Sequence, residues 1–257
     1  MSALQHFIET RRKDSEILLM THVVYGYPTV DESLALMRDL LDTGVELLEV
    51  QFPFSDPSAD GPSILNACHE ALENKPTLSA CLEDMAKLSR DYPDSRILLM
   101  SYLNPFYRYG LERLPKDAAQ SGISGFIVPD LPLELAGAFR SACNDADVEP
   151  VWMLTPETPA SRMQDICAAA TGLLYCVSRR GVTGKSDGNA QPLDDYLAGI
   201  RTYTDLPLAV GFGIRDAAQV AALTGKADIA ILGSGILDAF NAGGRAAVRD
   251  LVQSLRG

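Results

Sequence analysis

The segment ILLMTHVVYGYPTVDESLALMRDLLDTGVELLEVQF, residues 17–52, holds two short apolar runs separated by a helical pattern. The runs at 17–24 and 46–52 are nearly continuous, which is typical of parallel strands covered on both faces. Between them, apolar residues recur at helical spacing and the pattern stops at Gly44: Leu34, Met37, Leu40 and Leu41. The segment therefore predicts a strand–helix–strand unit with parallel strands.

Six more runs of this kind follow, at 96–103, 122–128, 148–154, 172–177, 206–211 and 227–232. Helical patterns alternate with them, one formed by Leu78, Leu82, Met85 and Leu88, and only the connection from 52 to 96 is long enough for an additional helix. Eight such units predict an α/β fold, a (β/α)8 TIM barrel in which residues 1–257 form a single domain. An open doubly wound sheet is the rival, although it usually needs fewer strands. The segment before residue 17 is expected to form an N-terminal helix that caps the bottom of the barrel.

Composition limits the classes of function. The chain has 257 residues, of which 47% are hydrophobic, enough for one large core or two small domains. A net charge of −12 argues against binding to nucleic acid or to an anionic membrane surface. The N-terminus carries neither a signal peptide nor a membrane span, so a cytoplasmic location is expected.

Cysteine and histidine patterns point to neither disulfides nor metal. The five cysteines are an odd set without a CxxC pair, typical of a reduced protein that uses them as core residues: Cys68, Cys81, Cys143, Cys167 and Cys176. The three histidines, His6, His22 and His69, show no metal-ligand spacing. No metal site is predicted.

Glycines follow the last two predicted strands. AVGFGIRDAAQV (209–220) places Gly211 and Gly213 after the seventh run, and AILGSGILDAF (230–240) places Gly233 and Ser234 after the eighth, where a helix opens. Glycine lets the backbone approach an anion, and helix N-termini present free N–H groups. Each loop alone is equally consistent with a tight turn and an ordinary helix cap. Their pairing at strands seven and eight favours a phosphate site.

A long glycine-containing loop, SRRGVTGKSDGNAQP (178–192), follows the sixth run. Long loops in compact domains are often lids over a site. Thr183 and Gly184 would then offer a hydroxyl and an amide to the same anion. The alternative is a solvated surface loop kept soluble by its basic residues.

Two acids stand out in LLEVQFPFSDPSADGP (47–62). Glu49 lies in an apolar strand and is expected to point into the barrel, where burial suits a carboxyl group to general acid/base catalysis. An interior Glu paired with a Lys or Arg from another strand explains it equally well. Asp60, before Gly61 and Pro62, fits a helix start, but its loop returns toward the mouth that holds Glu49.

Five ordered blocks of the chain resemble one family, the α subunit of tryptophan synthase. The first is LLEVQFPFSDPSADGP, and the others are LNPFYRYGLER (103–113), FIVPDLPLE (126–134), YCVSRRGVTG (175–184) and VGFGIRDAAQV (210–220). The resemblance implies a lyase that splits indole-3-glycerol phosphate into indole and glyceraldehyde 3-phosphate by a retro-aldol reaction, with no cofactor. It also implies an α2β2 assembly with a β subunit that uses pyridoxal phosphate to join indole to serine.

The resemblance also implies roles for particular residues. Glu49 would be the acid/base and Asp60 would stabilise the indole N–H. The family pattern implies that the following residues bind substrate: Tyr102, Tyr175, Thr183, Gly184, Phe212, Gly213, Gly233 and Ser234. It implies that three residues meet the β subunit: Pro53, Phe54 and Asp56.

Four positions depart from the family pattern. Gln51 replaces a small residue, usually Gly, and is expected to narrow the mouth or alter the setting of Glu49; His22 replaces an aromatic residue. Tyr27 stands in place of an Asp, and Arg180 in place of a small residue. These departures leave open a weakly catalytic chain that mainly activates a β subunit. They also leave open a stand-alone lyase that releases indole. A different phosphate-binding barrel enzyme would be expected to carry a basic catalytic residue on a strand, and no Lys is placed on one.

Overall fold

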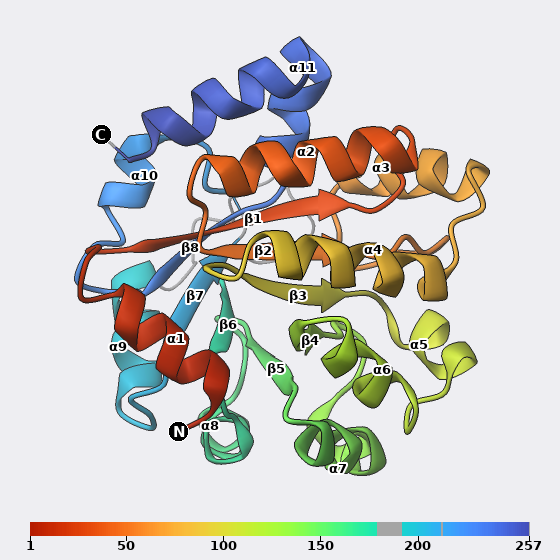
Figure 1. Ribbon diagram of the computed structural model, residues 1–257. Coiled ribbons are helices and arrows are strands. Elements are labelled where there is room, and N and C mark those ends of the chain that lie inside the picture. The colour runs from red at the N-terminus through yellow and green to blue at the C-terminus, as the bar shows by residue number, and fades with distance from the viewer. Residues whose placement is uncertain (179–191, 212, 257) are drawn as a thin grey trace.

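A computed structural model describes residues 1–178, 192–211 and 213–256. Its eight strands are all parallel and close into a barrel in sequence order, with β8 pairing β1 (Figure 1). The strands are β1 (Leu18–Val24), β2 (Leu47–Gln51), β3 (Arg96–Met100), β4 (Ile123–Ile127), β5 (Glu149–Leu154), β6 (Leu174–Val177), β7 (Leu208–Gly211) and β8 (Ile229–Leu232). The predicted TIM barrel is therefore confirmed, and the open doubly wound sheet is excluded.

Helices connect the strands and surround the barrel (Figure 1). They are α1 (Ala3–Arg11), α2 (Val30–Asp42), α3 (Pro62–Glu73), α4 (Leu78–Asp91), α5 (Leu103–Tyr109), α6 (Leu114–Gln120), the 3-10 helix η1 (Leu133–Leu135), α7 (Gly137–Ala146), α8 (Ala160–Ala169), α9 (Leu193–Arg201), α10 (Ala217–Ala221) and α11 (Ser234–Ser254).

The expectation of one connection with an additional helix is wrong. The connection from β2 to β3 does hold two helices, α3 and α4, but the shorter one from β3 to β4 holds two as well, α5 and α6. Gly110 makes this possible, because its φ of 113° turns the chain sharply between the two short helices. Both are seven residues long, too short to show a clear apolar period.

Two apolar layers hold the barrel together. Leu48 and Val50 point outward from β2 into the layer between strands and helices, whereas Leu47 points into the barrel interior. The interior layer also contains Leu4, Phe7 and Ile8 from α1. Figure 1 shows α1 near the ends from which the strands start. This arrangement confirms the predicted N-terminal capping helix, which keeps the lower interior residues from water.

The cysteines belong to the core, as expected. All five are buried and none forms a disulfide. Burial raises the pKa of the Cys68 thiol to about 12. In the part of the chain that the structure describes, no helix is long and apolar enough to cross a membrane, and no three His, Cys, Asp or Glu side chains are grouped so as to hold a metal ion.

The contact between α1 and the barrel interior can be tested by truncating one side chain. Ile8 is fully buried, so Ile8→Ala is expected to reduce the free energy of unfolding by about 2–5 kcal/mol. His6, exposed on the same helix, supplies the control, because His6→Ala is expected to change it by no more than about 0.5 kcal/mol. Urea unfolding of both variants measures the difference. Equal stability of the two would show that α1 does not seal the barrel.

Candidate active site

Glu49 points into the barrel from β2 and meets a side chain from β1. The parallel register sets His22 directly beside it, and His22 Nδ1 lies 3.0 Å from Glu49 Oε1. His22 is 4% exposed and Glu49 is 3% exposed. Nδ1 carries a proton in the cationic imidazole, which the raised pKa of His22 favours, and in that form it donates to Glu49 Oε1. Among the described residues, the charged partner of Glu49 is thus a histidine from the neighbouring strand, where an ordinary interior pair would use Lys or Arg.

Asp60 reaches the same mouth through the loop between β2 and α3. Its backbone N–H donates to the Pro57 carbonyl over 3.0 Å, and Gly61 caps α3 directly afterward. Two side chains donate to Asp60 Oδ2, each over 2.9 Å: the Gln51 amide and the Tyr102 hydroxyl. Asp60 is 9% exposed and therefore nearly buried. Its position depends on the loop and on contacts from β2 and from the N-cap of α5, which follows β3.

The charges of these side chains influence one another. Burial by itself lowers the pKa of His22, but the negative charge of Glu49, the hydrogen bond to it and the charge of Asp60 together raise that pKa above its ordinary value. Burial raises the pKa of Asp60, against the opposing effects of His22, Gln51 and Tyr102. The imidazole therefore favours its cationic form, and Asp60 holds a proton more readily than an exposed Asp.

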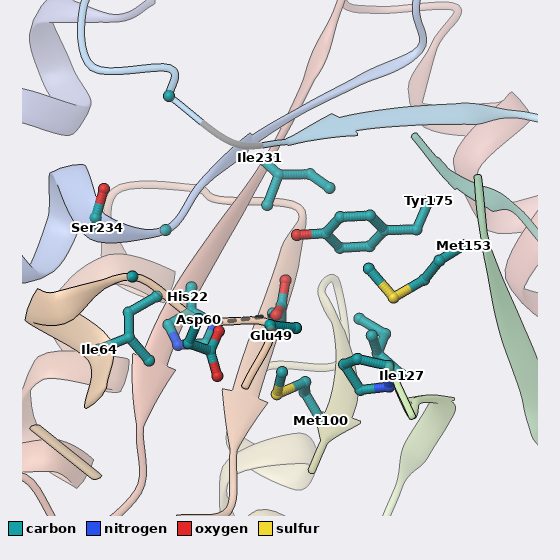
Figure 2. A pocket seen from close by; sticks show the side chains of 15 residues that line it. His22, Glu49, Asp60, Ile64, Met100, Ile127, Met153, Tyr175, Ile231 and Ser234 are labelled. Carbon is teal, nitrogen blue, oxygen red and sulfur yellow. Dashed lines mark hydrogen bonds and ion pairs between the residues drawn. The ribbon is translucent and has the colours of Figure 1, made fainter. Parts of the chain in front are cut away.

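A pocket joins the two acids at the C-terminal end of the barrel (Figure 2). Both acids and His22 line it, and the rest of its wall is mainly apolar: Ala59, Ile64, Met100, Ile127, Pro129, Met153, Tyr175 and Ile231. Figure 2 shows Tyr175 and Met153 on one side and Ser234 on the other, with the acids between them. The pocket suits a ligand with an apolar part at one end and a polar part at the other.

The polar end is built by the loops after β7 and β8. Gly213, Gly233 and Ser234 line the same pocket as the acids. Ser234 is the first residue of α11, and its N-cap Gly233 has no side chain to cap the helix. Gly213 has a φ of 106°, which a residue with a side chain rarely adopts. Free backbone N–H groups at a helix start favour an anion here.

Only some of the predicted site residues line the pocket. Tyr175 lines the pocket, but Tyr102 does not, because it stands behind Asp60 and packs against Phe54 with 5.5 Å between ring centroids. Of the predicted partner surface, Pro53 is buried, Phe54 half-buried and Asp56 exposed. Four predicted or departing residues lie outside the described residues: Thr183, Gly184, Phe212 and Arg180.

Three contacts could not be anticipated from the sequence. Gln51 binds Asp60, whereas the sequence suggested an effect on Glu49. His22 binds Glu49, and the only sequence signal for this was a polar residue inside an apolar strand. The Tyr27 hydroxyl donates a hydrogen bond to Asn241 Oδ1 over 2.9 Å, and neither residue lines the pocket that holds the acids.

An eight-stranded parallel barrel with paired acids and a helix N-terminus at its C-terminal mouth is the arrangement typical of (β/α)8 enzymes that bind phosphate esters. Residues 8–255 match the sequence model described as tryptophan synthase alpha chain. The chain belongs to this family.

Relatives and solved structures agree with that assignment. The tryptophan synthase alpha chain of Syntrophotalea carbinolica is 41% identical over 98% of this chain and 100% of its own. That of Desulfotalea psychrophila is 39% identical over 98% and 99%. A structure of Mycobacterium tuberculosis tryptophan synthase superposes with a TM-score of 0.91 at 30% identity, covering 99% of this chain and 97% of its own. The alpha subunit from Legionella pneumophila str. Paris gives 0.88 at 27% identity, covering 100% and 97%.

The buried charge of Asp60 predicts a pH-dependent stability. Because folding raises the pKa of Asp60 above its ordinary 3.8, the native state binds this proton more tightly than the unfolded chain does. The resulting stability is present below the ordinary pKa and is lost as pH rises through the native pKa. Asp60→Asn, which removes the charge at constant shape, is therefore expected to melt above wild type at neutral pH. The difference should shrink in acid, and a lower melting temperature at neutral pH would contradict this account.

Proposed function

We propose that this chain carries the lyase activity of its family, the retro-aldol cleavage of indole-3-glycerol phosphate to indole and glyceraldehyde 3-phosphate. One observation carries the proposal: two buried acids from separate segments face one pocket that is apolar at one end and opens on a helix N-terminus at the other. The substrate has the same distribution of polarity as the pocket, because its apolar indole ring and its phosphate lie at opposite ends of a short hydroxylated chain.

The two acids supply the chemistry of the cleavage. Protonated Glu49 gives its proton to indole C3, and the ring nitrogen becomes cationic. Asp60 stabilises that positive charge through the N–H group. The Glu49 carboxylate then takes the proton of the neighbouring glycerol hydroxyl, a carbonyl forms, and the carbon–carbon bond breaks with its electron pair returning to the ring. Glu49 ends protonated as it began, so the reaction needs neither a metal nor a redox partner.

The ends of the substrate would bind at the two ends of the pocket. The phosphate would accept hydrogen bonds from backbone amides around Gly213, Gly233 and Ser234, joined by Thr183 and Gly184. The indole ring would lie against Tyr175 and the apolar wall, with Phe212 beside it. Tyr102 would act through Asp60, to which it is bonded.

A β subunit is the expected partner. The β subunit of an α2β2 assembly would receive indole and contribute the pyridoxal phosphate, and this chain would hold no cofactor. We place the contact at the loop of Pro53, Phe54 and Asp56, of which Asp56 is exposed beside the site. We also propose a cytoplasmic location, which the five buried free cysteines support, because thiols stay reduced there.

The proposed acids can be tested by measuring indole release from indole-3-glycerol phosphate. Glu49→Gln is expected to lower kcat by about 10²–10⁴-fold, because it removes the group that gives and takes the proton. Asp60→Asn is expected to lower it by about 10²–10³-fold, because the cationic ring loses its counter-charge. Each variant keeps the size of the residue that it replaces.

The same assay separates the alternative functions. It should be run on the chain alone and with a β subunit. Full turnover by Glu49→Gln would refute the acid/base role. No turnover by wild type in either form, together with activation of the β subunit, would favour a mainly regulatory chain.

The anion site can be tested without turnover. Inorganic phosphate is expected to raise the melting temperature of wild type, because a ligand that binds only the folded state stabilises it. Ser234→Asp should abolish this shift by placing a negative charge at the start of α11. Ser234→Asn, a control of equal size without the charge, should retain a shift. An undiminished shift in Ser234→Asp would remove this helix from the site.

A further inference from the structure

Among the described residues, each acid is held through one of its two oxygens. Glu49 Oε1 bonds His22, whereas Oε2 is buried without a hydrogen-bond partner among the described residues. Both side-chain hydrogen bonds to Asp60 end on Oδ2. Since both acids line the pocket, the second oxygen of each is the one available to a ligand.

The groups that hold the acids come from adjacent positions in the barrel. His22 is the register partner of Glu49, and Gln51 lies two residues beyond Glu49, so that all three point inward. Gln51 is completely buried, and its side chain also adjoins the imidazole, where it contributes to the raised pKa of His22. His22 and Gln51 therefore form one polar layer around the acids, with His22 level with Glu49 and Gln51 one step nearer the mouth.

This layer is costly to keep. Within the described residues, His22 Nε2 and Gln51 Oε1 are buried without hydrogen bonds. Burying a polar atom that makes no hydrogen bond opposes folding. Apolar residues would fill the same space without that cost, so the two side chains call for an explanation beyond packing.

We propose that His22 and Gln51 are positioning residues, which hold Glu49 Oε1 and Asp60 Oδ2 so that the other oxygen of each acid meets the substrate. The inference rests on the proposed lyase function. Glutamate has three side-chain torsions, and a carboxylate that rotates freely presents the correct oxygen for only part of the time. His22 on Glu49, and Gln51 together with Tyr102 on Asp60, remove this freedom. Misplacement of a catalytic group by about 1 Å lowers a rate by about 100-fold.

Four variants test the proposal through indole release. His22→Phe removes the donor at similar size and is expected to lower kcat by about 10- to 100-fold, with KM changed less than about 3-fold. His22→Asn keeps an N–H close to the position of Nδ1 and should recover most of the loss. Gln51→Leu should have a smaller effect than His22→Phe, about 3- to 10-fold, because Tyr102 still holds Asp60.

Thr21→Val is the matched control. Thr21 is buried in β1 next to His22, and like its neighbours Leu19 and Val23 it faces the layer between strands and helices. Its hydroxyl has no hydrogen bond in the described part of the chain, so its removal should leave kcat unchanged.

A spectroscopic readout separates this proposal from the function on which it rests. The chain has only three histidines, so the ¹⁵N imidazole signals of His22 can be assigned with His22→Asn. A protonated Nδ1 whose signal shifts in Glu49→Gln would establish the hydrogen bond even if wild type cleaved no substrate. Equal kcat in wild type and His22→Phe, or equal losses in His22→Phe and His22→Asn, would overturn the positioning role. If wild type cleaves no indole-3-glycerol phosphate although the hydrogen bond between His22 and Glu49 is present, the proposed reaction is refuted instead.

Discussion

The parallel register between β1 and β2 is the constraint on which the site depends. It sets His22 beside Glu49, and the alternation of side chains along β2 directs Leu47, Glu49 and Gln51 inward while Leu48 and Val50 join the outer apolar layer. A shift of one residue would bury Glu49 among the helices and turn its apolar neighbours into the pocket. The two apolar layers, which specify this register, therefore also specify the orientation of the acid. The packing of the core therefore determines which way the side chain of Glu49 points.

Burial of so many polar side chains opposes folding at the mouth of the barrel. The raised pKa of Asp60 shows that its charged form is disfavoured there even with two hydrogen-bond donors. His22 shows the reverse balance, because two nearby acids outweigh the effect of burial on its pKa. Such groups persist where the rest of the fold is stable enough to hold them. Here the support comes from the apolar interior below the site, which α1 seals at the other end of the barrel.

Much of the fold could be predicted from the sequence, because each buried parallel strand leaves a continuous apolar run. All eight runs became strands, and the helix patterns ending near Gly44 and Tyr92 became α2 and α4. The short helices α5 and α6 were missed, because a seven-residue helix is too short to show a repeating pattern of apolar residues. Within the site, the sequence indicated the acids and the glycines after the last strands. It could not show that Gln51 and Tyr102 converge on Asp60, because that contact depends on the path of a loop and on three separate segments.

Binding an anionic substrate in a chain of net charge −12 raises an electrostatic difficulty that the pocket geometry resolves. Two carboxylates near a phosphate would repel it, and repulsion between charges falls with distance and with screening. The start of α11 stands on the opposite side of the pocket from the apolar wall around Tyr175 (Figure 2). The proposed phosphate site at its amides would attract the anion locally without a basic side chain. A protonated His22 would also neutralise one of the two negative charges, and the raised pKa of His22 favours that form. The same histidine that fixes Glu49 thus also lessens the repulsion between the acids and the far end of the substrate.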